Sequence, residues 1–61
     1  MRTIWLVTVT TPDGEEMYYA GAENGPMAML MANRAGFDSD AVEVKMIPNR
    51  HGIQASEWKK A

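Results

Sequence analysis

Residues 3–20 read TIWLVTVTTPDGEEMYYA and predict a β-hairpin. Residues 3–11 are rich in β-branched and aromatic types that alternate between two faces, as expected of a strand. Pro12 is preset for the first corner of a turn, and the Asp13-Gly14 pair suits the rest of it. A return strand is therefore expected over about residues 16–20.

A helix is expected over residues 26–35, between an asparagine and a glycine. Asn24 can accept hydrogen bonds from the free backbone N–H groups, and Pro26 is tolerated in the first turn. Gly36 can adopt the left-handed conformation that ends a helix. On a helical wheel, one side gathers the residues expected to pack on a sheet, which are Ala28, Met31, Ala32 and Ala35.

A third strand is expected over residues 42–47, until Pro48 interrupts the ladder. The order strand, strand, helix, strand predicts an α+β fold, a small two-layer ββαβ domain over residues 1–48. Its three-stranded antiparallel sheet would have the order 2-1-3, with the helix packed on one face through a right-handed crossover. Residues 49–61 are expected to form a C-terminal segment, a turn followed by a short helix or a tail.

The two faces of the sheet have different expected roles. The helix-covered face would hold alternate residues of the first and third strands, namely Trp5, Val7, Val9, Val42, Val44 and Met46. The other face carries Ile4, Leu6 and a tyrosine of the second strand, which together form an apolar patch. Three alternatives remain open for this patch: Ile53 and Trp58 fold back over it, a second copy or a foreign partner binds it, or it is simply exposed to solvent.

Size and composition narrow the function classes. Sixty-one residues make one domain, and a chain of this size buries only about 60% of its unfolded surface. The net charge of -2 argues against a dedicated nucleic-acid binder, whose affinity rests on neutralising phosphates. The N-terminal apolar run is short and broken by threonines, so it predicts neither a secretory signal nor a membrane span. The lack of cysteine favours a cytoplasmic location.

No catalytic, cofactor or metal site is expected. His51 is the single imidazole, and without cysteine a zinc site would need an improbable set of carboxylates. The acid pairs 15–16 and 38/40 lie in a hairpin and a loop, where carboxylates are normally solvated. Residues 21–25 precede a helix but lack the lysine and spacing of a phosphate loop.

Two surfaces are candidates for binding a partner. Met27, Leu30 and Arg34 lie close together on the solvent side of the expected helix, and an apolar anchor beside an arginine resembles a binding hot spot. Ile4 and Leu6 on the open sheet face are the second candidate. The alternative for the helix is that its exposed apolar residues have no binding role, because single ones are ordinary.

Three features carry a resemblance to a known group of proteins. They are the hairpin Thr11-Pro12-Asp13-Gly14, the helix start Ala22-Glu23-Asn24 and the strand Val42-Glu43-Val44. In this layout, and in its length and mild acidity, the chain resembles small accessory proteins of bacteriophages and mobile elements, among them some anti-CRISPR proteins. The similarity covers the layout of residues 2–48 and transfers no functional residue.

The resemblance implies a non-enzymatic module that binds a larger protein complex, such as a bacterial defence complex, and inhibits it. Two alternatives remain open. One is a homodimer with a structural or regulatory role, formed through open sheet faces or edge strands. The other is a single-stranded nucleic-acid-binding domain in which Trp5, Tyr18 or Tyr19 stacks on bases.

Overall fold

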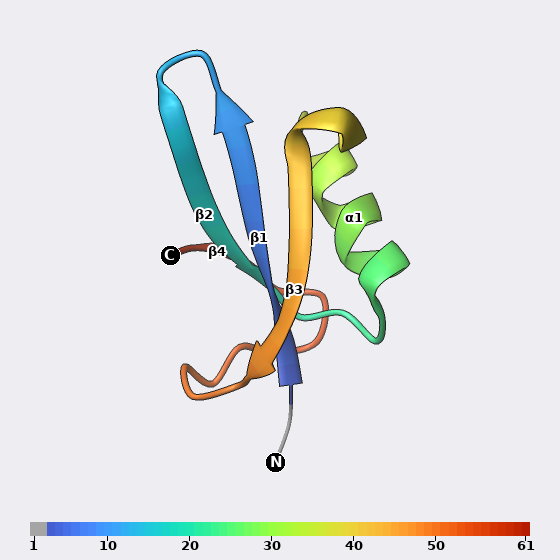
Figure 1. Ribbon diagram of the computed structural model, residues 1–61. Coiled ribbons are helices and arrows are strands. Elements are labelled where there is room, and N and C mark those ends of the chain that lie inside the picture. The colour runs from blue at the N-terminus through green and yellow to red at the C-terminus, as the bar shows by residue number, and fades with distance from the viewer. Residues whose placement is uncertain (1–2) are drawn as a thin grey trace.

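One helix and a four-stranded antiparallel sheet make up residues 3–61, the part of the chain that the computed structural model describes (Figure 1). In chain order the elements are β1 (Thr3–Thr11), β2 (Gly14–Ala20), α1 (Gly25–Arg34), the short 3-10 helix η1 (Ser39–Ala41), β3 (Val42–Pro48) and β4 (Trp58–Lys60). The predicted α+β class is thereby confirmed.

The hairpin predicted for residues 3–20 is confirmed. β1 and β2 pair in antiparallel fashion from Trp5 opposite Ala20 to Thr11 opposite Gly14. At the turn, the Thr11 hydroxyl donates a hydrogen bond to the Gly14 carbonyl oxygen (2.8 Å) and accepts one from the Asp13 N–H (3.3 Å). Gly14 has a φ of 129°, which residues with a side chain rarely adopt, so glycine is required at this corner.

The sheet has four strands in the order β3-β1-β2-β4, so the predicted three-stranded sheet was wrong in strand number and in its full order. β1 is flanked by β2 and β3, both antiparallel to it. The additional strand, β4, pairs with β2 from Tyr18 opposite Lys60 to Ala20 opposite Trp58. A short helix or a tail was expected at this position. The sequence did not indicate a strand here, because three residues are too few to show a strand alternation.

The ends of α1 follow from its capping residues. The Asn24 side-chain oxygen accepts a hydrogen bond from the Met27 N–H (2.9 Å) and caps the N-terminus. At the other end, the Phe37 N–H donates to the Ala32 carbonyl (3.1 Å) and the Gly36 N–H donates to the Asn33 carbonyl (3.0 Å). This pair of bonds is a Schellman motif, and the φ of 99° at Gly36 provides its left-handed residue.

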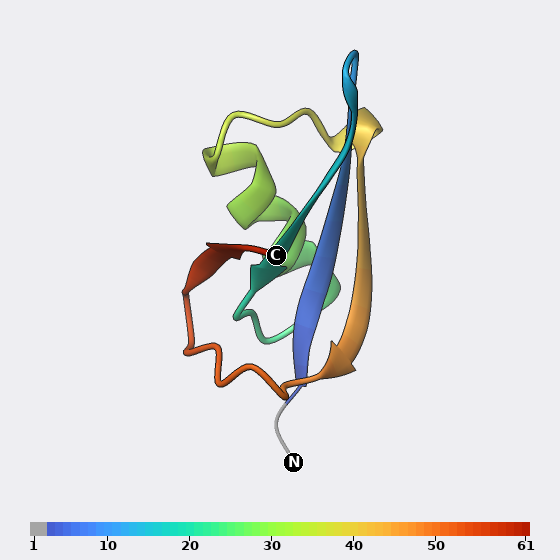
Figure 2. The ribbon, with the colours of Figure 1, turned by 90° about the vertical axis from the view of Figure 1, so that its left-hand side faces the viewer.

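Small residues bring the helix close to the sheet. Ala28 and Ala32 are both 0% exposed and form the contact surface of α1. A Cβ atom at Gly25 would lie 3.6 Å from the Trp5 ring and 3.7 Å from Val44, so the helix begins above these two side chains. Figure 2 shows that α1 then diverges from β1 and β3 toward its C-terminal end.

Two residues that the sequence assigned to the helix–sheet interface are instead exposed. Met46 shares the helix side of β3 with Val44, but it lies beyond the first residue of the helix and is 57% exposed. Ala35 is the C-cap of α1, at the end that has diverged from the sheet, and it is exposed too. Strand alternation predicts which face of the sheet a residue occupies, but it does not predict how far the helix extends over that face.

An aromatic cluster, formed by Tyr18, Phe37 and Trp58, packs between the helix layer and β4. The Tyr18 and Trp58 rings are stacked with centroids 4.8 Å apart, and the Phe37 ring lies 5.5 Å from Tyr18. These rings pack against the fully or nearly buried core, which consists of Val7, Val9, Ala20, Ala28 and Ala32. The aromatic cluster thus extends the core on the β2 and β4 side.

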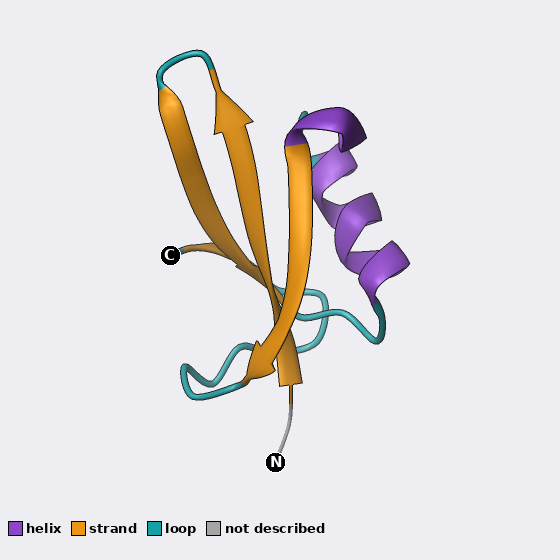
Figure 3. Ribbon diagram, in the orientation of Figure 1, coloured by secondary structure: helices purple, strands orange, loops and turns teal. Residues whose placement is uncertain are grey.

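Residues 49–57 connect β3 to β4 and are held against the end of β2 (Figure 3). The Gly21 N–H donates to the Glu57 carbonyl (2.9 Å), and the Gly21 carbonyl accepts from the Ser56 N–H (2.7 Å). A Cβ atom at Gly21 would lie only 1.9 Å from the Gln54 carbonyl oxygen. The C-terminal segment therefore needs glycine at this position to dock.

Candidate functional site

The three helix residues proposed from the sequence lie together on the solvent side of α1, and we call Met27, Leu30 and Arg34 the helix stripe. The i, i+3 and i, i+4 spacings make them neighbours on the helix surface. Met27 is 44% exposed and Leu30 is 38% exposed, although both are large apolar side chains. Arg34 is exposed in the last turn, where its positive charge also suits the helix dipole. The sequence therefore placed this stripe on the correct side of the helix.

The open sheet face holds the other two candidates, and the structure separates them. Leu6 is half-buried, with Tyr19 and Lys45 as its register neighbours on β2 and β3. Ile4 is only 1% exposed and lines the same cavity as Ile53, which is itself buried. Ile4 is therefore a core residue in this fold and offers no accessible surface to a partner.

Only one of the two expected covering residues lies near this face. Ile53 is buried beside Ile4, whereas Trp58 stacks on Tyr18 on the helix side of the sheet. The His51 ring instead stacks on Tyr19, with centroids 4.7 Å apart. The turn after β3 thus covers part of the open face, while Leu6 keeps partial exposure.

The aromatic residues considered for stacking on nucleic-acid bases lie on different sides of the sheet. The Trp5 indole N–H donates a hydrogen bond to the Ala22 carbonyl (3.0 Å), and its ring packs against the core under α1. Tyr18 belongs to the aromatic cluster. Tyr19 alone of the three is on the open face, where His51 already stacks on it. An open aromatic platform of the kind that single-strand binders use is therefore not formed by these three rings.

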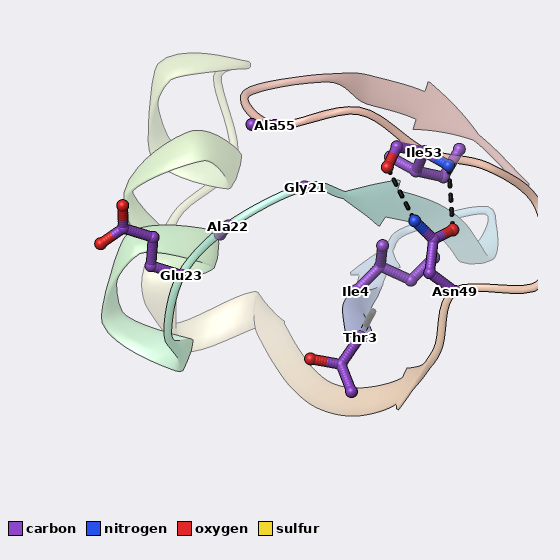
Figure 4. Close-up of a pocket in the computed structure, with 8 residues that line it drawn as sticks. All are labelled: Thr3, Ile4, Gly21, Ala22, Glu23, Asn49, Ile53 and Ala55. Atoms are coloured by element: carbon purple, nitrogen blue, oxygen red, sulfur yellow. Dashed lines mark hydrogen bonds between the residues drawn. The ribbon is translucent and has the colours of Figure 1, made fainter. Parts of the chain in front are cut away.

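A cavity of about 310 Å³ lies at the end of the sheet near Gly21 (Figure 4). It is lined by Thr3, Ile4, Gly21, Ala22, Glu23, Asn49, Ile53 and Ala55. Both ends of the Asn49 amide are hydrogen-bonded to Ile53, because the amide donates to the Ile53 carbonyl (2.8 Å) and accepts from the Ile53 N–H (2.9 Å). The Glu23 carboxylate points away from Asn49. The polar groups of this cavity do not converge on a common point where a ligand could be bound.

The titratable side chains are also dispersed. Within residues 3–61, no group of three or more histidine, cysteine or acidic side chains is placed to hold a metal ion. Glu15 and Glu16 lie on opposite faces of β2, as consecutive strand residues do. Asp38 precedes η1 and Asp40 lies within it, and both are exposed.

A hydrogen bond between the Tyr18 hydroxyl and the Glu16 carboxylate makes the titration of Tyr18 a test of the structure. The Tyr18 hydroxyl donates to the Glu16 carboxylate (2.5 Å). This hydrogen bond, partial burial and the negative charge of Glu16 raise the pKa of Tyr18 above its ordinary value of 10.0. The folded state favours the neutral phenol. The resulting stabilisation of the fold is therefore fully present below the ordinary pKa and is lost as pH rises through the raised pKa.

We expect Glu16→Gln to lower the pKa of Tyr18, since the charge and the charged acceptor are both removed. The titration is followed by NMR of ¹³C-labelled tyrosine Cζ. Glu15→Gln is the matched control, because Glu15 lies on the opposite face of β2 and should leave the pKa of Tyr18 unchanged. Equal effects of the two variants would show that the hydrogen bond does not set this pKa.

The chain matches no protein-family model, and neither the curated proteins nor the solved structures gave a match. Among the described helices, none combines the length and apolar character needed to cross a membrane.

One exposed feature was missed by the sequence reasoning, which placed Met46 in the core. Met46 lies on the helix side of the sheet, and Met17, which is 44% exposed, lies on the open face. Both side chains add to the exposed apolar surface of the described residues. The available signal was the position of Met46 near the end of its strand, just before Pro48.

Proposed function

We propose that this chain is a non-enzymatic protein–protein interaction module that binds a larger protein or complex through the helix stripe. The observation that carries the proposal is the exposure of Met27 (44%) and Leu30 (38%) on a helix that is anchored by other residues. Ala28 and Ala32 form the buried contact of α1, so Leu30 and Met27 are not its main anchors. Their apolar surface is available to a partner, and methionine adapts well to irregular surfaces.

Arg34 gives the stripe a charged border. An apolar centre with an arginine at its rim fits a partner surface that has an apolar pocket beside acidic groups. The resemblance in layout to anti-CRISPR proteins makes a bacterial defence complex the first partner to test, with inhibition as the consequence of binding. A cytoplasmic location belongs to the same proposal.

We expect Leu30→Glu to weaken partner binding by about tenfold or more, because a charge would replace the apolar anchor. Tagged wild type and variants are incubated with bacterial lysate, bound proteins are identified by mass spectrometry, and the affinity for the retained complex is then titrated. Met17→Glu is the matched control, since it makes the same kind of change at 44% exposure on another surface.

Support for the proposal requires a complex that binds wild type and Met17→Glu but not Leu30→Glu. Circular dichroism and thermal melting show whether each variant is folded. Unfolding of Leu30→Glu would mean that Leu30 is needed for the core. Equal binding by a folded Leu30→Glu would remove the helix stripe as the binding surface.

A further inference from the structure

β3 forms an edge of the sheet, and among residues 3–61 no strand pairs with its outer side (Figure 1). This edge is seven residues long, whereas the opposite edge strand, β4, has only three. Alternate residues of β3 direct their N–H and C=O groups toward β1, and the others present these groups at the free edge, where another strand can bind. The charge pattern of β3 indicates which strand fits.

The charges on β3 match those of a second, antiparallel β3. When a two-fold axis relates two antiparallel strands, one residue lies opposite its own copy and its neighbours pair reciprocally. A register centred on Glu43 or on Lys45 would place like charges opposite each other, which destabilises a sheet. A register centred on Val44 places Glu43 opposite Lys45 of the second copy, and this favourable pair occurs twice.

The same register also pairs apolar residues on the helix side of the sheet. Val44 would lie opposite Val44, and Val42 would lie opposite Met46 of the second copy. Met46 is 57% exposed, more than Met17, Met27 or Leu30. Pairing of the two edges would therefore place an apolar neighbour beside the most exposed of these four side chains.

We propose that a second copy of this chain binds along β3 in the antiparallel register centred on Val44. The two four-stranded sheets then form one continuous sheet, and both helices lie on the same side of it. This inference does not rest on the proposed function, whose residues belong to α1, so each can fail without the other.

Two charge reversals test the register. Glu43→Lys has lysine at positions 43 and 45, and Lys45→Glu has glutamate at both, so each variant would face like charges in its own dimer. We expect each variant alone to dimerise about tenfold more weakly than wild type or worse. An equimolar mixture of the two is expected to form a heterodimer, in which every cross-strand pair again has opposite charges. Sedimentation equilibrium gives the affinities, and native mass spectrometry identifies the heterodimer.

Lys59→Glu is the control, because Lys59 is an exposed lysine on β4, away from the β3 edge. It should dimerise as the wild type does. Glu43 and Lys45 are exposed as well, so the reversals should leave the fold intact, and circular dichroism checks this. A wild type that is still monomeric at about 1 mM would overturn the proposal. So would a dimer whose affinity is unaffected by the reversals, or a mixture without preference for the heterodimer.

Discussion

Replacement of Gly21 by alanine is expected to lower the free energy of unfolding by about 3 kcal/mol. The new methyl group would lie 1.9 Å from the Gln54 carbonyl oxygen, far inside van der Waals contact. The atom it meets is backbone, so residues 54–57 must move as a unit. That movement breaks the two hydrogen bonds that join Gly21 to Glu57 and Ser56. For a chain of this length the total stability is of the order of 3–9 kcal/mol, so the loss is a large share of it.

Gly25→Ala is the matched control for this prediction. A Cβ atom at Gly25 would meet its nearest neighbours at 3.6 to 3.7 Å, which is ordinary contact, and alanine is the better helix former. Urea denaturation of both variants gives the difference in stability, and amide hydrogen exchange of residues 54–61 reports whether the segment has detached. A Gly21→Ala variant as stable as Gly25→Ala would mean that the C-terminal segment does not pack on Gly21.

Local signals in the sequence were sufficient for the hairpin and the helix. The Pro12, Asp13 and Gly14 turn and the caps at Asn24 and Gly36 act through backbone conformation and neighbouring N–H groups. Such signals operate within a few residues and can be read directly from the chain. The alternation of residues 3–11 and 42–47 likewise fixed the face that each side chain occupies.

Long-range contacts account for what the sequence did not predict. β4 forms because the end of β2 has an unpaired edge and because Trp58 stacks on the Tyr18 ring, 40 positions earlier in the chain. The burial of Ile4 depends on the path of residues 49–53, which Asn49 closes onto Ile53. The residues around one member of such a contacting pair do not indicate the other member.

The candidate surfaces show the same difference between local signals, which the sequence reveals, and long-range contacts, which it does not. The solvent side of α1 was predicted correctly, because the spacing of Met27, Leu30 and Arg34 is a local property of a helix. On the open sheet face, the accessibility of Ile4 was not predicted, since Ile53 covers it. On the helix side, the exposure of Met46 was not predicted either. Whether a strand residue is accessible depends on where other elements begin and end above it.

Ala32→Leu is expected to lower the free energy of unfolding by about 2–3 kcal/mol, because the helix contacts its surroundings too closely to admit a larger side chain. Ala32 is 0% exposed, and its carbonyl accepts the Phe37 N–H that closes the helix C-terminus. A leucine would therefore push α1 outward, disturb that closure and loosen the contacts of Phe37 with Tyr18. Urea denaturation gives the change in stability, and near-ultraviolet circular dichroism follows the packing of the aromatic rings.

Ala35→Leu makes the identical change one turn later and serves as the control. Ala35 is exposed at the C-cap, where the helix has diverged from the sheet, so the larger side chain should alter stability by less than about 0.5 kcal/mol. The helical wheel places both alanines on the same side and predicts similar losses for the two variants. The packing instead predicts a large loss for Ala32→Leu alone, because Ala32 is 0% exposed in the helix contact whereas Ala35 is exposed at the C-cap. Equal losses would show that the helix lies flat on the sheet along its whole length.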